Sequence, residues 1–446
     1  EKLETLAQTN KDQVEKLTVA AVQKASSSNE DAGLIAKVVA VANDELANKV
    51  VVEVSKSATE EKQSLSAKVL KAIVDTEPSK METLNEEIKT TIIKQTLEAA
   101  KNQEEGGLIE EDNLSDVVAE IVVKTDAATA SKVIEEVNNT ETESSLSLKV
   151  MSGISDKDAN KINQLAETNK ESIDKLAEKA IQSAKSTNED SELIAKVVAV
   201  ASDEIANKVV EEVSKNSSEE NQSLSAKVLK AIVDTQPNKI EILNEEIKTT
   251  VISQAIDAAE NQQVGNSTDQ DNLSNTVAEI ITKADRSTAA KVLETLDEKT
   301  TNTDSKLALN VINNLTKQDN YEEKIEILSA TTLTVTENIK KLTEKAVKSV
   351  ENDQDLETLT NIVEKSKGTL SNEILNSAQI SEENKKNVSK IIIKVVEKNP
   401  EKAVEILEKN EKASVIAETI KTKIENEEAI TTEDFDEVFD TNVSPN

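Results

Sequence analysis

The chain has almost none of the side chains on which common catalytic and metal-binding chemistry depends. Its 446 residues contain no histidine, no cysteine and no tryptophan. The sequence therefore lacks the usual general base at neutral pH, any thiol nucleophile, and any nitrogen or sulfur ligand for zinc, iron or copper. An enzyme built only from carboxylates, hydroxyls and lysines would still need a concave site with perturbed ionisation. The composition predicts a protein that is not an enzyme and that uses no cofactor.

Positive charge is also scarce. The chain has 86 acids against 53 bases, a formal charge of −33, and its only arginine is Arg286. Such a chain repels phosphate backbones and anionic membrane surfaces, because affinity for both comes from lysine and arginine. No segment approaches the roughly 20 apolar residues of a spanning helix. We therefore expect neither nucleic-acid binding nor membrane insertion.

What the sequence does contain is an internal duplication. The nine letters LIAKVVAVA at Leu34–Ala42 recur at Leu193–Ala201, and the fourteen letters QSLSAKVLKAIVDT at Gln63–Thr76 recur at Gln222–Thr235. Both pairs are 159 residues apart. Because the offset is constant, the two copies are in register.

A shorter period lies inside each copy. The steps between the leading leucines of similar helix starts alternate between 31–34 and 47–49 residues, so that two steps make about 80. A third, diverged block runs from about Asn338 to Glu425. These leucines are Leu34, Leu65, Leu114, Leu146, Leu193, Leu224, Leu273, Leu307 and Leu356.

Each sub-repeat of about 40 residues has the pattern of helix, tight turn, helix. Leu65, Val69, Ala72 and Ile73 fall at i, i+4, i+7 and i+8, which is one face of a helix. Glycine and proline total ten residues, and no alternating run bounded by hairpin turns occurs. Predicted N-caps are Ser64, Asn113, Asp126 and Ser155, the last in a capping box with Asp158. Predicted first helical residues are Pro78, Pro237 and Pro400.

The expected fold class is all-α, with tandem helical repeats that form an elongated α-solenoid. Sub-repeats of about 40 residues pair into units of about 80, and two such units make one block of 159 residues. The period and the stacked helix pairs resemble HEAT and armadillo solenoids, and the near-identical tandem blocks resemble the repeat regions of large bacterial surface proteins. The expected divisions are a partial repeat at 1–28, helical repeats at 29–107, 108–187, 188–266 and 267–352, a diverged repeat at 353–425 and an acidic tail at 426–446.

Candidate ligand sites are few. Asp156, Asp158, Asn160 and Glu167 imitate an EF-hand calcium loop, but Lys161 stands where the loop needs glycine, and the apolar spacing through the segment is helical. We therefore interpret this segment as a helix start. Acidic clusters could at most bind divalent cations loosely, and we favour a solvated acidic surface. These clusters are Glu104 with Glu105, Glu110 to Asp112, and Glu433 to Glu437. Arg286 is interpreted as incidental.

Two of the three aromatic residues lie in the acidic tail. Phe435, Val438 and Phe439 fall at i, i+3 and i+4, so that one helical turn would place them on one face. Such a face could anchor the tail in a groove of a partner, or it could cover the apolar end of the last repeat. We favour the cap, because every solenoid end needs a cover.

The favoured function is a non-catalytic structural or spacer array, part of a larger surface-exposed or filament-forming protein that acts through homotypic or scaffold contacts. A near-exact duplication supports it, because a spacer gains reach with each copy whereas an enzyme needs one asymmetric site. The alternative is a protein-binding α-solenoid scaffold that uses a concave face. The expected partners are other copies or other proteins. An extracellular or cell-surface location in a bacterium is favoured, although a chain without cysteine also fits the cytosol.

Overall fold

The computed structural model describes most of the chain, and every regular element in the described part is helical. No strand occurs among these residues, which confirms the predicted all-α class. The described residues are 10–59, 62–110, 112–140, 145–217, 221–263, 265, 271–300, 306–330, 333–366, 368–436 and 439. By its internal contacts the chain divides into two compact units, Glu1–Asn216 and Ser217–Asn446, which we call the N-terminal and the C-terminal unit.

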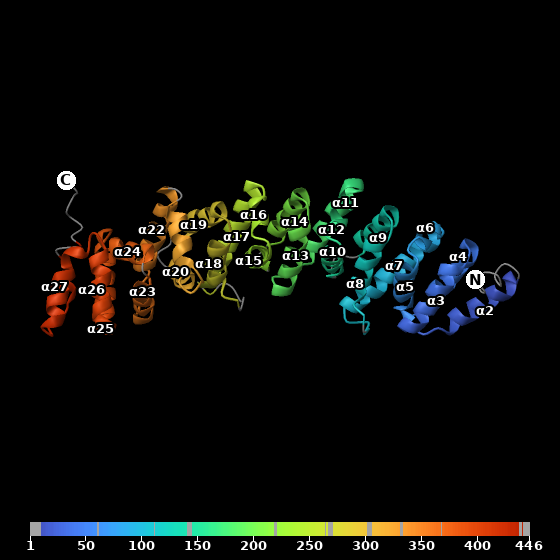
Figure 1. Ribbon diagram of the computed structural model, residues 1–446, viewed down its shortest axis with the longest axis horizontal. Coiled ribbons are helices and arrows are strands. Elements are labelled where there is room, and N and C mark those ends of the chain that lie inside the picture. Colours follow the sequence, from blue (N-terminus) through green and yellow to red (C-terminus); the bar gives the residue numbers. More distant parts are fainter. Residues whose placement is uncertain are drawn as a thin grey trace. The chain divides into compact units, whose positions relative to one another are not determined.

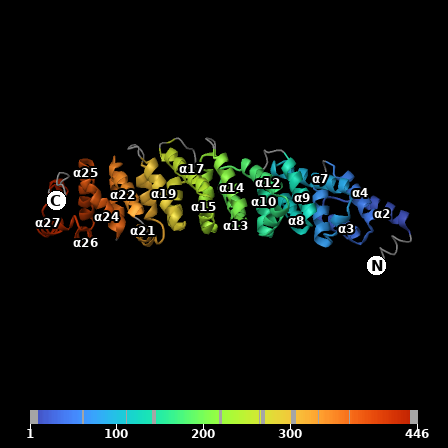
Figure 2. The ribbon, with the colours of Figure 1, turned by 90° about the horizontal axis from the view of Figure 1, so that it is seen from above.

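The N-terminal unit is a stack of helical hairpins in two layers (Figures 1 and 2). In one layer α2, α4, α7, α9, α12 and α14 pack in that order, and in the other α3, α5, α8, α10 and α13 do so. Its helices are α2 Lys11–Lys24, α3 Asn29–Val41, α4 Asp44–Ser57, α5 Leu65–Thr76, α6 Lys80–Thr83, α7 Glu86–Glu104, α8 Leu114–Lys124, α9 Ala127–Asn139, α10 Leu146–Lys157, α11 Lys161–Thr168, α12 Lys170–Gln182, α13 Asn188–Val200 and α14 Asp203–Asn216.

The C-terminal unit repeats this arrangement. One layer is formed by α15, α18, α20, α23 and α25, and the other by α17, α19, α22 and α24. Its helices are α15 Leu224–Thr235, α16 Asn238–Glu241, α17 Glu245–Gln263, α18 Leu273–Lys283, α19 Arg286–Lys299, α20 Leu307–Leu315, α21 Tyr321–Ser329, α22 Leu333–Lys348, α23 Asp353–Lys365, α24 Thr369–Asn376, α25 Glu382–Lys398, α26 Pro400–Lys409 and α27 Ser414–Glu425, with the short 3₁₀ helices η3 Ser377–Gln379 and η4 Thr432–Phe435.

The core of each unit lies between its two layers. The helices α5 and α15 have the same twelve letters, LSAKVLKAIVDT, and in both the apolar stripe is buried, as at Leu65, Ile73 and their copies Leu224 and Ile232. A helix inside the stack, such as α5, buries its stripe against the preceding and the following hairpin, so that a single hairpin cannot form a core alone. This dependence on neighbours is the defining property of an α-solenoid.

The helix starts agree only in part with the predicted caps. Asn113 and Asp126 accept backbone N–H groups as N-caps of α8 and α9, as predicted. Ser64 precedes α5, but its hydroxyl donates to Glu110 instead of capping. The capping box at Ser155 is wrong, because Ser155 is buried inside α10 and donates to the carbonyl of Met151.

One of the three prolines occupies the predicted position. Pro400 is the first residue of α26. Pro237 is the residue before α16, and Pro78 lies two residues before α6, so these two predictions are wrong. The reason is a tight turn ahead of each short helix, in which the N–H of Met81 donates to the carbonyl of Pro78 and that of Ile240 to the carbonyl of Pro237.

Candidate functional site

The C-terminal aromatic residues are buried. Phe435 ends η4, which packs against α25, and both Phe435 and Phe439 are 0 % exposed. Their rings are stacked, with centroids 6.3 Å apart and planes inclined by 8°. The N–H of Phe439 donates to the carbonyl of Phe435 at 3.1 Å. The third residue of the predicted face, Val438, lies outside the described residues.

Ion pairs fix the same segment to two helices. The carboxylate of Asp434 pairs with Lys423 of α27, and that of Asp436 with Lys385 of α25 at 3.1 Å. Burial alone would raise the pKa of Asp434, but the hydrogen bonds from Lys423 and from the N–H of Thr431 outweigh burial and lower it. Two acids of this cluster, Asp434 and Asp436, are therefore paired with lysines of the stack.

The other acidic clusters behave in the same way. Glu104 of α7 pairs with Lys149 of α10 at 2.5 Å, and Glu110 pairs with Lys68 of α5 at 2.7 Å. Among the described residues, no group of three or more acids is arranged to hold a metal ion. Loose cation binding by the acidic surface stays a prediction.

The segment that imitates a calcium loop is divided between two helices. Asp156 belongs to α10, and α11 begins at Lys161 and includes Glu167. The ammonium group of Lys161 is buried and donates to the carbonyl of Thr125 at 2.9 Å. A twelve-residue ligand loop therefore does not form here.

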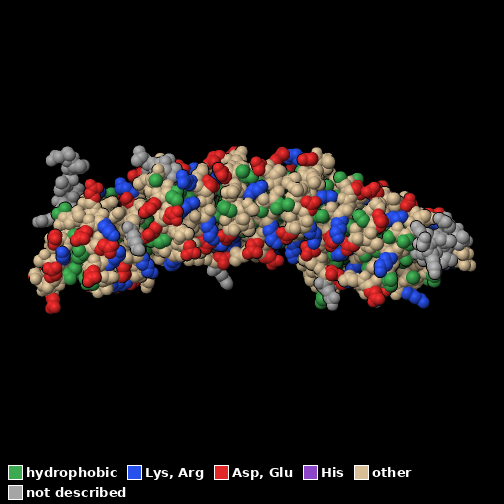
Figure 3. All heavy atoms as spheres, viewed as in Figure 1, with side chains coloured by type: hydrophobic (Ala, Val, Ile, Leu, Met, Phe, Trp, Pro, Cys, Tyr) green, Lys and Arg blue, Asp and Glu red, His purple; other side chains and the backbone are tan. Residues whose placement is uncertain are grey.

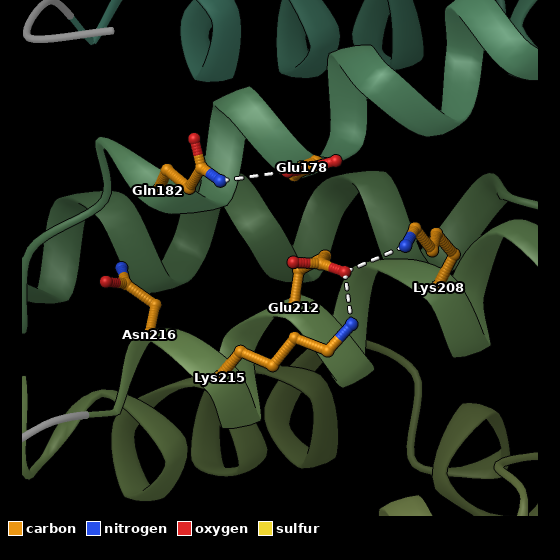
Figure 4. A pocket seen from close by; sticks show the side chains of 6 residues that line it. All are labelled: Glu178, Gln182, Lys208, Glu212, Lys215 and Asn216. Carbon is orange, nitrogen blue, oxygen red and sulfur yellow. Dashed lines mark hydrogen bonds and ion pairs between the residues drawn. The ribbon is translucent and has the colours of Figure 1, made fainter.

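A polar hollow lies between α12 and α14 of the N-terminal unit (Figure 4). Its centre is Glu212, whose carboxylate accepts from Lys208 and from Lys215, each at 2.8 Å. At its margin Gln182 donates to Glu178 at 3.0 Å, and Asn216 donates to the carbonyl of Ile181. The six lining residues are Glu178, Gln182, Lys208, Glu212, Lys215 and Asn216.

The charged groups in this hollow form ion pairs, and their pKa shifts do not favour acid–base or nucleophilic catalysis. Burial opposes ionisation of Glu212, but hydrogen bonds from both lysines outweigh it and lower its pKa. Hydrogen bonds to Glu211 and Glu212 raise the pKa of Lys215. A catalytic carboxylate would need a raised pKa, and a nucleophilic lysine a lowered one, if either is to act near neutral pH. In this hollow the pKa of the carboxylate of Glu212 is lowered and the pKa of Lys215 is raised.

In the C-terminal unit the sole arginine lines a second hollow. Arg286 is the first residue of α19 and is exposed, and across the hollow lie Leu328, Val335 and Asn338. Within it Lys291 pairs with Glu294 at 2.9 Å. The lining also includes Glu245, Ser287 and Thr334.

A ring of charged residues joins neighbouring hairpins and occurs twice. In the first copy Lys71 and Asp75 of α5 form a four-membered ring of ion pairs with Glu120 and Lys124 of α8, and in the second copy the residues 159 positions later do the same. The second ring consists of Lys230, Asp234, Glu279 and Lys283. All eight N–O distances lie between 2.5 and 3.3 Å. The rings connect α5 with α8 and α15 with α18.

The rings predict a loss of stability in acid. For Asp75 and Asp234 burial raises the pKa, but hydrogen bonds from two lysines outweigh burial and bring it below the ordinary 3.8. A depressed pKa stabilises the fold above the unfolded value, and this stabilisation is lost as pH falls through the folded value. The denaturant midpoint should therefore decrease as the pH falls below about 4. Asp75→Asn should flatten this dependence by roughly 1 kcal/mol or less, because the side chains of the ring remain 19 to 42% exposed to solvent. Asp234→Asn should have the same effect. If stability depends on pH with the same slope in the wild type and in both variants, the role of the rings is contradicted.

Sequence reasoning missed a set of lysines that cap the preceding hairpin. In each case the ammonium group donates to the carbonyl at the C-terminal end of a helix 36 to 40 residues earlier, where positive charge is favourable. Burial lowers the pKa of Lys324, one of these lysines. The pairs are Lys80 with Ala42 at 2.7 Å, Lys161 with Thr125 at 2.9 Å and Lys324 with Ala284 at 2.7 Å. The signal in the sequence was a lysine at corresponding positions just after the turn, as at Lys80 and Lys239.

Charge on the surface is mixed in sign. On the face seen in Figure 3, acidic and basic side chains are interspersed over both units and apolar side chains are scattered. No helix in the described part of the chain is long and apolar enough to cross a membrane. The geometry therefore gives a stack of helical repeats in which many charged side chains form ion pairs.

The fold defines the class of protein, an all-α solenoid of tandem helical repeats. No protein-family model matches the sequence, and no curated protein matches it either. Among solved structures, a circular tandem repeat protein with novel repeat topology and enhanced subunit contact surfaces aligns over 96% of both chains, with 15% identity and a TM-score of 0.25. Kap121p bound to Ste12p aligns over 97% of this chain, with 11% identity and a TM-score of 0.24, and the alignment spans 57% of Kap121p. With TM-scores this low, the fold class rests on the helices themselves.

Proposed function

We propose that the chain is a non-catalytic structural or spacer array that acts through homotypic or scaffold contacts within a larger surface-exposed or filament-forming assembly. The observation that carries this proposal is the repetition of the ion-pair ring, with the same residues at the same spacing in both copies. Duplication has kept the contacts between hairpins, whereas the second hollow is not kept, because Ala127 stands at the position that corresponds to Arg286. A protein selected for length needs the contacts between hairpins in every copy, and it does not need a unique site.

The spacer role predicts that length follows copy number. A shortened variant lacks residues 29–187, and a lengthened variant carries a second copy of 29–187 after Thr187, so that both keep the 159-residue register. Because each hairpin contacts only its neighbours, both variants should fold with unchanged helix content per residue. The maximum dimension from small-angle X-ray scattering should rise by the same increment from the short variant to the natural chain and from that to the long one.

Two results would contradict the spacer role. Loss of helix content in the shortened variant would reveal long-range contacts that a repeat array does not have. An unchanged maximum dimension across the three lengths would show that added copies fold back and give no reach. Circular dichroism of all three variants is the control that separates these outcomes.

For the C-terminal segment we propose the capping role, with Phe435, Val438 and Phe439 as the cover of the last repeat. Supporting observations are the complete burial of Phe435 and Phe439 and the ion pairs of Asp434 and Asp436. A side chain that serves as an anchor for a partner would have to leave this buried position before binding.

A further inference from the structure

The hollow that Arg286 lines lies where the two copies of the repeat differ in two ways. The arginine itself stands where the first copy has Ala127. The neighbouring helix α22 has 16 residues, whereas α12, which occupies the corresponding place in the first copy, has 13. We call this site the Arg286 hollow. It lies between α19, α21 and α22, and its volume of about 530 Å³ is within the range of small-molecule sites.

The added residues of α22 form part of the Arg286 hollow. The letters EKA occur in both helices, at Glu178–Ala180 and 166 positions later at Glu344–Ala346. Ahead of these helices the offset is only 163, between Lys161 and Lys324. Three residues are therefore inserted before the shared part of α22, and they lengthen this helix at its start, where Val335 lines the hollow. The insertion and the arginine thus change the same place.

Asn338 of α22 gives the hollow a buried polar group. This residue is 6% exposed and lines the hollow. No described residue forms a hydrogen bond with its side-chain amide. Another buried asparagine of this unit is paired, because the amide of Asn387 donates to the carbonyl of Val347 at 3.0 Å. A buried amide without a hydrogen bond is destabilising, so the donor and the acceptor of Asn338 are available to a ligand in the hollow.

The charges of the hollow leave one positive charge uncompensated. Lys291 pairs with Glu294 at 2.9 Å, and Glu245 lies 3.5 Å from Lys248. No described residue forms an ion pair or a hydrogen bond with the guanidinium group of Arg286. One uncompensated charge matches a monoanion, whereas a doubly charged phosphate would also face the carboxylates of Glu245 and Glu294. A carboxylate is a monoanion that the planar guanidinium group binds with two parallel hydrogen bonds.

We propose that the Arg286 hollow binds an N-acylated aliphatic amino acid, either free or as the last residue of a peptide. Its carboxylate binds Arg286, and its acyl amide binds the amide of Asn338. Its aliphatic side chain packs against Leu328 and Val335, which line the hollow and are 0% and 4% exposed. The inference goes beyond the spacer role, because the first copy lacks the arginine and the site therefore occurs once.

The first test uses N-acetyl-leucine and the full natural chain. Titration followed by saturation-transfer NMR should give a Kd on the order of 1 mM, as expected for a ligand of this size. N-acetyl-leucinamide lacks the carboxylate and should bind at least about tenfold more weakly. The acetylated peptide Ala-Ala-Ala-Leu with a free carboxyl end separates the two sources of the ligand. Binding about tenfold tighter than that of N-acetyl-leucine identifies a peptide end, and equal or weaker binding identifies a free amino acid derivative.

Variants test the roles of the two polar residues. Arg286→Ala restores the residue of the first copy, so it should keep the helix content of the natural chain and yet bind N-acetyl-leucine at least about tenfold more weakly. Arg286→Lys keeps the charge without the paired hydrogen bonds, and its affinity should lie between the two. Asn338→Ser introduces the residue of the first copy, Ser172, and should weaken binding about threefold or more. Lys390→Ala is the matched control, because it removes an exposed positive charge of α25 outside the hollow and should leave the Kd unchanged.

Three results would overturn the proposal. They are no binding of N-acetyl-leucine to the natural chain at about 10 mM, equal affinity of the natural chain and Arg286→Ala, and equal affinity for N-acetyl-leucine and its amide. Inorganic phosphate that displaces N-acetyl-leucine at equal concentration would also overturn it, because the hollow would then select charge alone. None of these results alters the dimensions measured in the length series, so a failure of this site is distinct from a failure of the spacer role.

Discussion

Replacing Phe435 and Phe439 together with alanine should lower the free energy of unfolding of the C-terminal hairpins by at least about 3 kcal/mol. Both rings are completely buried and stack on each other, so that the double variant loses the burial of two large side chains and leaves a cavity. Thermal melts by circular dichroism and hydrogen exchange in α25 and α27 measure the effect. Exchange should accelerate most in these two helices, because Asp436 and Asp434 attach the C-terminal segment to α25 and α27 by ion pairs.

Val415→Ala is the matched control for this variant. It also removes an apolar side chain near the C-terminus, but from a position that is 74% exposed, so the melt should hardly change. If the phenylalanine variant melts like the natural chain and loses assembly with other proteins, the tail is an anchor for a partner. If it is normal in both respects, the tail has neither role.

Gly153→Ala should destabilise the N-terminal unit by about 1 to 3 kcal/mol, although alanine is the better helix former. Gly153 lies in α10 where it crosses α8, and an added Cβ would stand 2.9 Å from the Cβ of Ala119 and 3.2 Å from the carboxylate of Asp116. The obstructing methyl group belongs to a helix in the core and has no rotamer to change, so the two helices must separate. Urea denaturation followed by circular dichroism measures this loss.

Gly33→Ala is the control with the opposite sign. Gly33 lies inside α3, and an added Cβ would meet nothing within 4 Å. The variant should be more stable by up to about 1 kcal/mol, because only the helix preference of alanine acts. If the free energy of unfolding changes by a similar amount in both variants, Gly153 is not needed for the close approach of α8 and α10.

Sequence patterns were sufficient for the fold class because the duplication and the helical spacing of leucines repeat many times. A single wrong helix start, such as the one at Ser155, does not alter a pattern that nine leucines share. The details of the starts were harder to predict. A serine or proline near a helix end is compatible with several local arrangements, and only the packing of the next hairpin decides among them.

The partners of the charged residues could be predicted least. Glu110 pairs with Lys68, and Glu104 with Lys149, across 42 and 45 positions of the sequence. The offset of 159 residues shows that positions correspond, but not which positions face one another across neighbouring hairpins. A run of acids therefore looks like a solvated surface in the sequence, although several of its members join one hairpin to the next. The different burial of Leu17, which is 74% exposed, and Leu176, which is buried, could not be predicted for the same reason, because these two leucines have different neighbours.

Native-state hydrogen exchange at increasing urea concentration tests the central claim most directly, that the stability of this protein is a sum over hairpins and their interfaces. We predict that amides exchange in groups of about one hairpin, with opening free energies that differ between α3, α13 and α25 and that vary separately with urea. If the amides of all three helices instead converge on one opening free energy with one urea dependence, the chain unfolds as a single cooperative domain, and the account of a nearest-neighbour array is contradicted.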